Sequence, residues 1–216
     1  MRAVIFANGL LTSWPDGIKI SPRRDLIIAA DGGLKHCKRL GITPHVVVGD
    51  MDSADPADLA SAEEKGARID RHPSRKDETD LWLAVRAALD KNPDEIIILG
   101  ALGGRWDMTF ANALILVAGE LQTIEARILD GNQEIFVLQG GQRVRLLGQK
   151  GDLLSLMPLT EKVSGIVLSG FLYTLNNEDL SLGSTRGISN VFEGDSGQIE
   201  LKTGKLLVTI THGPTR

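Results

Sequence analysis

The feature that most constrains the fold of this chain is a series of short apolar runs, each of which stops at a glycine, asparagine or aspartate. Continuous apolar runs of this length are typical of strands that are buried on both faces, as in a parallel sheet. Helical patterns lie between several of them, and this alternation predicts an open α/β sheet with right-handed crossovers. The expected strands are Ala3–Ala7, Leu26–Ala30, His45–Val48, Glu95–Leu99 and Ala126–Leu129.

The expected helices are marked by their ends as well as by their apolar spacing. A helix that begins at Pro56 has the residue preferred in a first turn, and Asp52 or Ser53 is a candidate for its cap. Asp77 or Thr79 is the corresponding candidate cap for the next helix. The expected helices are Leu34–Leu40, Pro56–Lys65, a segment with Leu81, Val85, Ala88 and Leu89 on one face, and Asp107–Leu121.

After Asp130 the pattern changes to short strands separated by glycine turns, with no helical period. Gln139–Gln142 and Thr203-Gly204 each separate two apolar runs, and both predict hairpins. We therefore predict an α/β domain over residues 1–132 and an all-β sandwich or barrel over residues 133–216. The strands expected in the second domain are Glu134–Leu138, Arg143–Leu147, Asp152–Met157, Val163–Leu168, Phe171–Leu175, Ile188–Phe192, Gln198–Lys202 and Leu206–Thr211.

Composition excludes several classes of protein. Cys37 is the single cysteine, so an intrachain disulfide framework is impossible. A net charge of −4 argues against a broad nucleic-acid or anionic-membrane surface. No apolar run approaches the length of a membrane-spanning helix or a signal sequence. We expect a cytoplasmic protein that binds neither nucleic acid nor membranes.

Unusual residues follow the expected strands, at the sheet edge where ligands bind in open parallel sheets. In Asp31-Gly32-Gly33 the glycines allow backbone amides to approach a phosphate, although the segment also fits an ordinary tight turn. Asp50 and Asp52 follow a buried strand two residues apart, so both carboxylates can reach one cation, and Mg²⁺ prefers such ligands. The alternative is a solvated turn.

Two further segments combine charges of both signs. Arg75 and Lys76 precede Asp77 and Asp80 just before an expected helix, where the cations suit phosphate and the acids suit either a metal or a helix cap. The glycine-rich turn Gly100–Asp107 offers a guanidinium to phosphate and a carboxylate as a cap or a substrate contact. The residues thus point to a Mg²⁺-dependent enzyme acting on a phosphorylated nucleotide.

In chain order, these segments resemble the thiamine pyrophosphokinase (thiamine diphosphokinase) family. The resemblance continues in Gly151–Pro158, Gly170–Tyr173 and Gly183–Asn190, and spans residues 7 to 212. It implies transfer of a pyrophosphoryl group from ATP to the hydroxyl of thiamine, with release of AMP. It also implies a Rossmann-like N-terminal domain, a β-sandwich C-terminal domain that binds thiamine and a homodimer.

The residue patterns and the resemblance together assign roles to residues of this chain. The expected catalytic acids are Asp50, Asp52, Asp77, Asp80 and Asp107, of which Asp50, Asp52 and Asp80 are expected to bind Mg²⁺ and Asp80 and Asp107 are candidates for the general base. The expected nucleotide-binding residues are Asn8, Asp31, Gly32, Gly33, Arg75, Lys76, Thr79 and Arg105. Ser189 and Asn190 are the expected thiamine contacts.

The chain departs from the family pattern at Met108, Leu172 and Val191, which leaves the acceptor open. One alternative is a pyrophosphokinase for another heterocyclic alcohol, such as a hydroxymethylpterin. The other is a non-catalytic regulator that binds nucleotide or thiamine. The paired carboxylates Asp50 and Asp52 favour catalysis, because a pure binding protein does not need them.

Overall fold

A computed structural model describes residues 1–15 and 17–213 of the chain. The chain divides into two compact units, Met1–Gly131 and Asn132–Arg216. Within the residues described, no helix is both long and apolar enough to cross a membrane.

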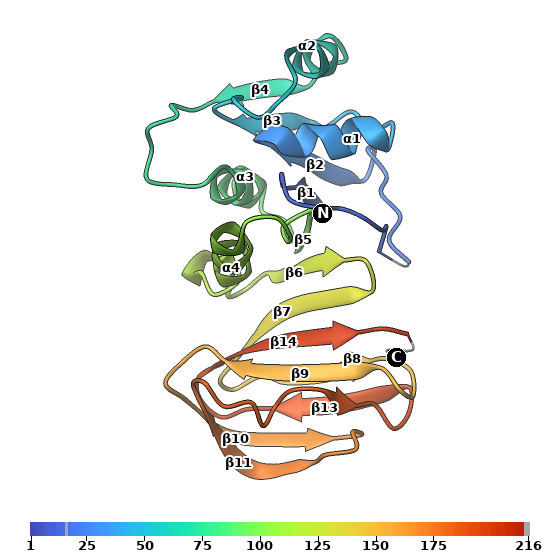
Figure 1. Ribbon diagram of the computed structural model, residues 1–216, viewed down its shortest axis with the longest axis vertical. Helices are drawn as coiled ribbons and strands as arrows, with labels where there is room; N and C mark the ends of the chain where they lie inside the picture. Colours follow the sequence, from blue (N-terminus) through green and yellow to red (C-terminus); the bar gives the residue numbers. More distant parts are fainter. Residues whose placement is uncertain (16, 214–216) are drawn as a thin grey trace. The chain divides into compact units, whose positions relative to one another are not determined.

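The first unit contains parallel strands in the spatial order β6-β5-β1-β2-β3-β4 (Figure 1). Side chains on both faces of the central strands are buried, as in the adjacent pair Ile5 and Phe6, which explains their unbroken apolar sequences. The strands are β1 (Arg2–Phe6), β2 (Asp25–Ala30), β3 (Val46–Gly49), β4 (Arg68–Arg71), β5 (Glu95–Leu99) and β6 (Glu125–Asp130).

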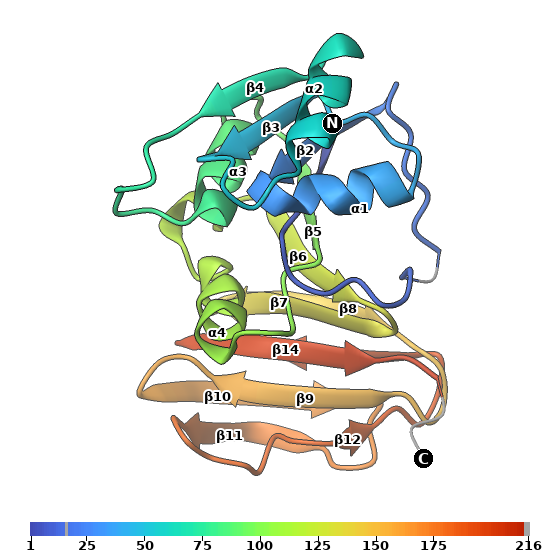
Figure 2. The same cartoon turned by 45° about the horizontal axis from the view of Figure 1, so that its top comes forward.

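Helices cover both faces of this sheet (Figure 2). Cys37 and Leu59, from α1 and α2, share a core cluster with Val4 and Phe6 of β1. Because side chains alternate along a strand, α3 packs on the opposite face, where it contacts β1, β2 and β3. The helices are α1 (Leu34–Arg39), α2 (Pro56–Glu64), α3 (Asp80–Leu89) and α4 (Trp106–Ile115), with short 3₁₀ turns at Asp31–Gly33 and Gly119–Leu121.

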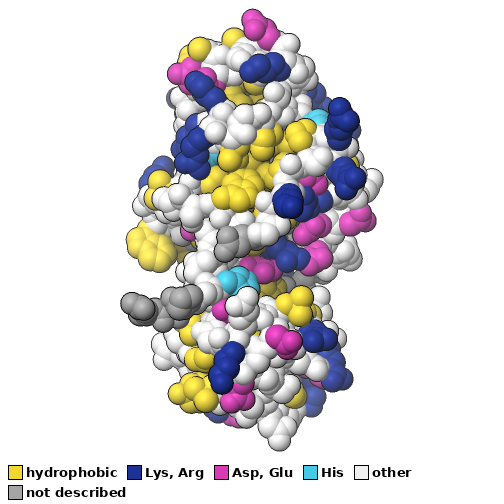
Figure 3. Space-filling model, turned by 90° about the vertical axis from the view of Figure 1, so that its right-hand side faces the viewer, with side chains coloured by type: hydrophobic (Ala, Val, Ile, Leu, Met, Phe, Trp, Pro, Cys, Tyr) yellow, Lys and Arg dark blue, Asp and Glu magenta, His cyan; other side chains and the backbone are white. Residues whose placement is uncertain are grey.

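The segment between β1 and β2 has no helix among its described residues. Its apolar side chains Trp14, Ile18 and Ile20 pack against the core cluster, and the indole nitrogen of Trp14 donates to the Ile18 carbonyl at 2.7 Å. Figure 3 shows hydrophobic side chains, bordered by basic ones, on the displayed face of this unit.

The order in which the chain adds strands to the sheet reverses between the neighbouring strands β1 and β5. The chain adds β2, β3 and β4 on one side of β1 and then returns to add β5 and β6 on the other side. The connections that leave β1 and β5 at the carboxyl edge therefore lead to strands on opposite sides, and open α/β sheets bind ligands at this position. Backbone bonds from Gly9 to Gly100 and from Leu10 to Leu102 hold the two departing loops together.

The sequence predicted five of the six parallel strands, and Glu95–Leu99 matches residue for residue. It missed β4, because Arg68–Arg71 is an edge strand whose charged side chains leave no apolar signal. Thr79 caps α3, as one of the two candidates predicted. The predicted cap of α2 was wrong: Asp55, immediately before Pro56, accepts hydrogen bonds from the amides of Ala57 and Asp58.

The predicted helix Asp107–Leu121 was wrong in its extent. The α-helix ends at Ile115, and a separate 3₁₀ turn follows at Gly119–Leu121. Ala118 between them has extended backbone dihedrals, so the apolar spacing that continued through this region does not belong to one helix.

The regular elements of the second unit, in its described residues, are all strands, in the orders β12-β9-β14-β7 and β11-β10-β13-β8. The pairings within both groups are antiparallel, as predicted for this part of the chain. One core cluster contains side chains from both groups, for example Leu156 of β9 and Ile166 of β10. The strands are β7 (Gln133–Gln139), β8 (Arg143–Leu147), β9 (Leu153–Pro158), β10 (Lys162–Ser169), β11 (Leu175–Ser181), β12 (Asn190–Val191), β13 (Ser196–Glu200) and β14 (Lys205–Thr211).

Both predicted hairpins were wrong. The turn Gln139–Gln142 joins β7 to β8, and Thr203-Gly204 joins β13 to β14, yet each turn carries the chain from one group of strands to the other. The two turns instead pack together, since the amide of Gly140 donates to the Gly204 carbonyl at 2.9 Å. Local turn signals cannot distinguish a hairpin from this crossing, because both need glycine.

Two predicted strands near the end of the chain were also wrong in extent. Phe171 makes only an isolated bridge to Phe192, and the regular strand starts at Leu175. The two rings pack edge to face with centroids 4.5 Å apart, so the apolar signal reports core packing. Of the predicted strand Ile188–Phe192, only Asn190–Val191 is regular.

The crossing of the two turns gives a stability test. A methyl group on Gly140 would lie 2.8 Å from the carbonyl oxygen of Lys202 and from Cα of Thr203, both of which are backbone atoms. We predict that Gly140→Ala lowers the free energy of unfolding in urea by about 1–3 kcal/mol. Gly194→Ala is the control, because its added methyl meets no atom within 4 Å, and its effect should stay within about 0.5 kcal/mol. Equal effects of the two substitutions would contradict this account.

Candidate functional site

A cavity of about 430 Å³ lies in the first unit, among the loops that follow β1, β2, β3 and β5 and the starts of α3 and α4. It therefore occupies the carboxyl edge of the parallel sheet that the sequence singled out. The predicted site residues among its lining are Asn8, Asp31, Asp50, Asp52, Asp80 and Arg105.

Three carboxylates meet at the acidic end of this cavity. Asp31, Asp50 and Asp52 offer oxygens that all lie within 4.8 Å of one another. Met51 has a φ of 66° between the last two, and this turn lets the Asp52 amide donate to Asp50 Oδ1 at 3.2 Å. The Ser53 hydroxyl donates to Asp52 Oδ1 at 2.9 Å.

Gly49 makes this gathering possible. Its φ of 148° is unfavourable for a residue with a side chain, and a methyl group there would lie 2.9 Å from Cβ of Asp31 and 3.0 Å from Asp80 Oδ1. A glycine at the end of β3 thus lets the carboxylate that follows β2 and the carboxylate that begins α3 approach the same point.

Asp31 carries the least favourable charge of the group. Its side chain is 3% exposed, and Oδ1 has no hydrogen-bond partner among the described residues. Burial raises the pKa of Asp31; hydrogen bonds from the Gly32 amide and the Ser53 hydroxyl oppose this rise, and the charges of Asp80 and Asp52 add to it. For Asp50 the hydrogen bond from the Asp52 amide lowers the pKa.

This donor set fits a divalent cation. Mg²⁺ is bound by one or two carboxylates together with water and phosphate oxygens. A buried carboxylate oxygen without a partner is costly unless a cation or a donor satisfies it. The sequence predicted Asp50, Asp52 and Asp80 as ligands, whereas the geometry groups Asp31 with Asp50 and Asp52.

Asp80 pairs with Lys76 instead. Lys76 Nζ lies 2.9 Å from Asp80 Oδ1 and 3.6 Å from Asp50 Oδ2, and its side chain is 14% exposed. Burial acts to lower the pKa of Lys76, but pairing with these two carboxylates outweighs burial and raises it. The ammonium group of Lys76 therefore lies at the margin of the acidic cluster.

The other end of the cavity, over β1 and β5, is lined by amide and basic side chains in place of carboxylates. Asn8 is held by Lys35, whose Nζ donates to its carbonyl at 2.9 Å and to Oδ1 at 2.7 Å. Asn112 of α4 is 5% exposed; its Nδ2 donates to the Ala101 carbonyl at 2.7 Å, while Oδ1 has no partner among the described residues. Sequence reasoning missed both residues. Lys35 is an exposed helix residue with no distinguishing signal, whereas Asn112 is a polar residue at a position where the helix pattern is apolar.

Several other predicted residues have local structural tasks. A methyl group on Gly33 would lie 2.0 Å from the Phe6 carbonyl oxygen, and one on Gly32 would lie 2.4 Å from Asn8 Oδ1. Gly33 is therefore required by the backbone packing of the loops after β1 and β2, whereas a side chain at Gly32 would displace the side chain of Asn8. Thr79 Oγ1 accepts from the Trp82 amide at 3.2 Å.

The remaining charged residues lie on the surface. Arg75 and Asp77 are exposed in the segment before α3, outside the cavity lining. Asp107 also lies outside the lining and pairs with Arg105, whose Nε donates to Asp107 Oδ1 at 3.1 Å. The hydrogen bonds from this guanidinium lower the pKa of Asp107, which makes it a weak proton acceptor while the pair lasts.

Ser189 and Asn190 belong to the second unit. Asn190 is 6% exposed, and its Oδ1 accepts from the amides of Tyr173 and Val191 while Nδ2 donates to the Tyr173 carbonyl at 2.7 Å. Its side chain therefore fixes the backbone at Tyr173. Ser189 is exposed, with a φ of 59°.

The charge on Asp31 predicts a gain in stability when it is removed. Because the folded pKa is raised, the contribution of this group is present below its unfolded pKa of about 3.9 and is lost as pH rises through the folded pKa. In EDTA at pH 7.5 we expect Asp31→Asn to be about 0.5–2 kcal/mol more stable than the wild type in urea unfolding, with a smaller gain at pH 4.5. A variant that is less stable at pH 7.5, or a gain that does not grow with pH, would contradict this.

Comparison with known proteins identifies the family. The sequence model described as "Thiamin pyrophosphokinase, catalytic domain" matches residues 19–128, and "Thiamin pyrophosphokinase, vitamin B1 binding domain" matches residues 142–208. The thiamine pyrophosphokinase of Bacillus subtilis is 31% identical over 204 residues, which cover 94% of this chain and 95% of that protein.

Solved structures of this family have the same fold as this chain. The crystal structure of thiamine pyrophosphokinase from Bacillus subtilis has a TM-score of 0.88 at 30% identity, and the match covers 98% of this chain and 99% of that one. Thiamin pyrophosphokinase from Candida albicans shares the fold, with a TM-score of 0.82 at 20% identity over 98% of this chain and 89% of that one. The resemblance in the sequence is confirmed, and the chain belongs to the thiamine pyrophosphokinase family.

Proposed function

We propose that this protein transfers the pyrophosphoryl group of ATP to the hydroxyl of thiamine, giving thiamine diphosphate and AMP. The observation that carries the proposal is the convergence of Asp31, Asp50 and Asp52 in a cavity at the carboxyl edge of the sheet, in a chain of this family. A regulator without catalysis does not require three carboxylates that repel one another.

Asp31, Asp50 and Asp52 are the residues that would hold Mg²⁺, and Asp80 lies beside them. When bound, Mg²⁺ neutralises phosphate charge and helps to align the reacting groups. The ligand set proposed here thus replaces Asp80 of the sequence prediction with Asp31, because Asp80 already pairs with Lys76.

The chain's own residues orient the nucleotide. The end of the cavity over β1 and β5, with Asn8 and Asn112, suits the nucleoside. The acidic end suits the phosphates that would bind the metal. The first amides of α4, in the connection that follows β5, have no side-chain cap, so they can donate to the phosphate nearest the nucleoside together with the Arg105 guanidinium. Arg105 would then exchange Asp107 for phosphate, because both bind the same planar donor group.

Attack of the thiamine hydroxyl on the β-phosphorus releases AMP, and the hydroxyl proton needs an acceptor. Asp80 and Asp107 remain the candidates. Each of the two pairs with a cation, Asp80 with Lys76 and Asp107 with Arg105, but Asp80 lines the cavity and Asp107 does not. Asp80 is therefore the better placed of the two, and such a base typically contributes about 10²–10⁴ in rate.

We propose that the first unit is a Rossmann-like nucleotide-binding domain and the second a β-sandwich that binds thiamine. Exposed Ser189 and Tyr173 are the side chains available for the acceptor, and Asn190 acts by fixing the Tyr173 backbone.

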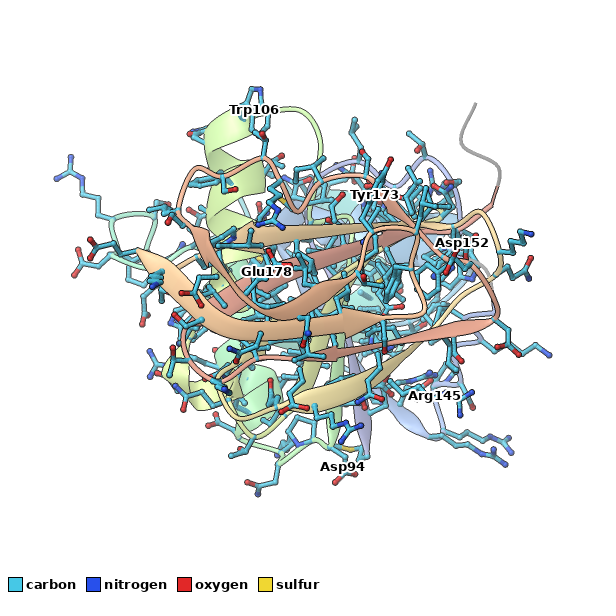
Figure 4. The ribbon with its side chains drawn as sticks, turned by 90° about the horizontal axis from the view of Figure 1, so that it is seen from below. Asp94, Trp106, Arg145, Asp152, Tyr173 and Glu178 are labelled. Carbon is cyan, nitrogen blue, oxygen red and sulfur yellow. The ribbon has the colours of Figure 1, made fainter. Side chains whose placement is uncertain are left out.

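The family also favours a homodimer. Trp106, Phe110 and Leu114 leave one side of α4 apolar and exposed, and Trp106, labelled in Figure 4, is 81% exposed. A second subunit could cover such a surface.

The test is the formation of AMP from ATP, Mg²⁺ and a panel of alcohols that includes thiamine and a hydroxymethylpterin. We predict AMP and thiamine diphosphate in equal amounts, and a loss of at least about 100-fold in kcat for Asp50→Asn and Asp52→Asn without loss of fold. Asp70→Asn is the matched control, because Asp70 is a partly exposed carboxylate on β4 outside the cavity lining.

The outcome of this assay distinguishes the proposed function from its two alternatives. AMP formation with the pterin alone would support the other pyrophosphokinase, and thiamine or ATP binding without AMP formation would support the regulator. Near wild-type rates in both Asp50→Asn and Asp52→Asn would refute the metal-binding assignment.

A further inference from the structure

The acidic end of the cavity has an internal cation. Asp31, Asp50, Asp52 and Asp80 place four carboxylates around the end of β3. Among the described residues, the ion pairs that reach this group come from Lys76, at 2.9 Å from Asp80 and 3.6 Å from Asp50. Lys76 approaches the group from outside the cavity lining, whereas Lys35, which is part of the lining, is bound to Asn8.

Lys76 is positioned so that its side chain can move away from the carboxylates. It lies in the irregular segment between β4 and α3, four residues before Asp80, so its backbone is not part of a strand or helix. Its ammonium group sits on a flexible stem with three rotatable donors. Lys76 thus gives the carboxylates a counter-ion without any bound metal, although Asp31 Oδ1 has no hydrogen-bond partner among the residues that the structure describes.

We propose that Lys76 is a tethered counter-ion that holds the acidic cluster together in the metal-free protein and opposes metal binding until nucleotide arrives. This inference rests on the proposed function, because it assumes a metal at Asp31, Asp50 and Asp52. Lys76 shares Asp50 with that site, so its positive charge repels a divalent cation there. Triphosphate oxygens give Lys76 another acceptor, and its movement to them frees Asp50.

Two opposite effects follow for Lys76→Gln. The metal-free protein loses the only ion pairs seen at the cluster in the described part of the chain, so it becomes less stable in EDTA. The nucleotide-free protein binds Mn²⁺ more tightly, by roughly 3- to 10-fold, because one nearby positive charge is gone. A residue whose role was only to support the loop would lower both stability and metal affinity.

The experiment is a Mn²⁺ titration of the full-length, nucleotide-free protein, followed by electron paramagnetic resonance of free Mn²⁺, with melting curves in EDTA and in Mn²⁺. The variants are Lys76→Gln, Lys76→Arg, which keeps the charge, and Asp50→Asn. Lys38→Gln is the control, because Lys38 is exposed and pairs with Asp58 on α2, outside this cavity.

We expect tighter Mn²⁺ binding in Lys76→Gln alone, with a lowered melting temperature in EDTA that Mn²⁺ restores. Equal or weaker Mn²⁺ binding in Lys76→Gln, while Asp50→Asn abolishes binding, overturns the role of Lys76 and leaves the metal site intact. Unchanged Mn²⁺ binding in Asp50→Asn overturns the metal site itself, and this inference with it. If Lys76→Gln does not fold, Lys76→Arg must bind Mn²⁺ as weakly as the wild type, and tighter binding overturns the proposal.

Discussion

Repulsion among carboxylates at the carboxyl edge of the parallel sheet is the constraint on which the arrangement of the site depends. Asp31 is buried with an oxygen that has no hydrogen-bond partner in the described part of the chain, and Gly49 is needed for Asp31 and Asp80 to approach each other. Such a group is unfavourable in an isolated protein and becomes favourable when a cation is bound. The fold supplies the rigidity that holds it, because β2 and β3 are neighbouring strands with buried cores.

Much of the first unit was predictable because each buried parallel strand has an unbroken apolar sequence. The edge strand β4 was not, since Arg68–Arg71 packs too little apolar surface to leave a signal. In the second unit the strands were largely predictable but their partners were not. The turn at Gly140 looks like a hairpin in sequence, and only its contact with the turn at Gly204 reveals that the chain changes sheet there.

The candidate site was predictable in its location and only partly in its details. Asp50 and Asp52 were identified from their spacing after a strand, but the third member of their group depends on which strands are neighbours. Parallel pairing of β2 with β3 brings Asp31 to them, and no local pattern contains that pairing. Asn190 was predicted from the sequence as a thiamine contact. In the structure its side chain forms hydrogen bonds with the Tyr173 backbone, and no sequence pattern indicated them.

The most direct test of this account is a crystal structure of the protein with Mn²⁺ and a non-hydrolysable ATP analogue, with the metal located by its anomalous scattering. The account predicts a peak bonded to carboxylate oxygens of Asp31, Asp50 and Asp52, with the analogue's phosphates completing its coordination and its base over β1 and β5. A metal peak ligated by phosphates alone, or located away from Asp50 and Asp52, would contradict it.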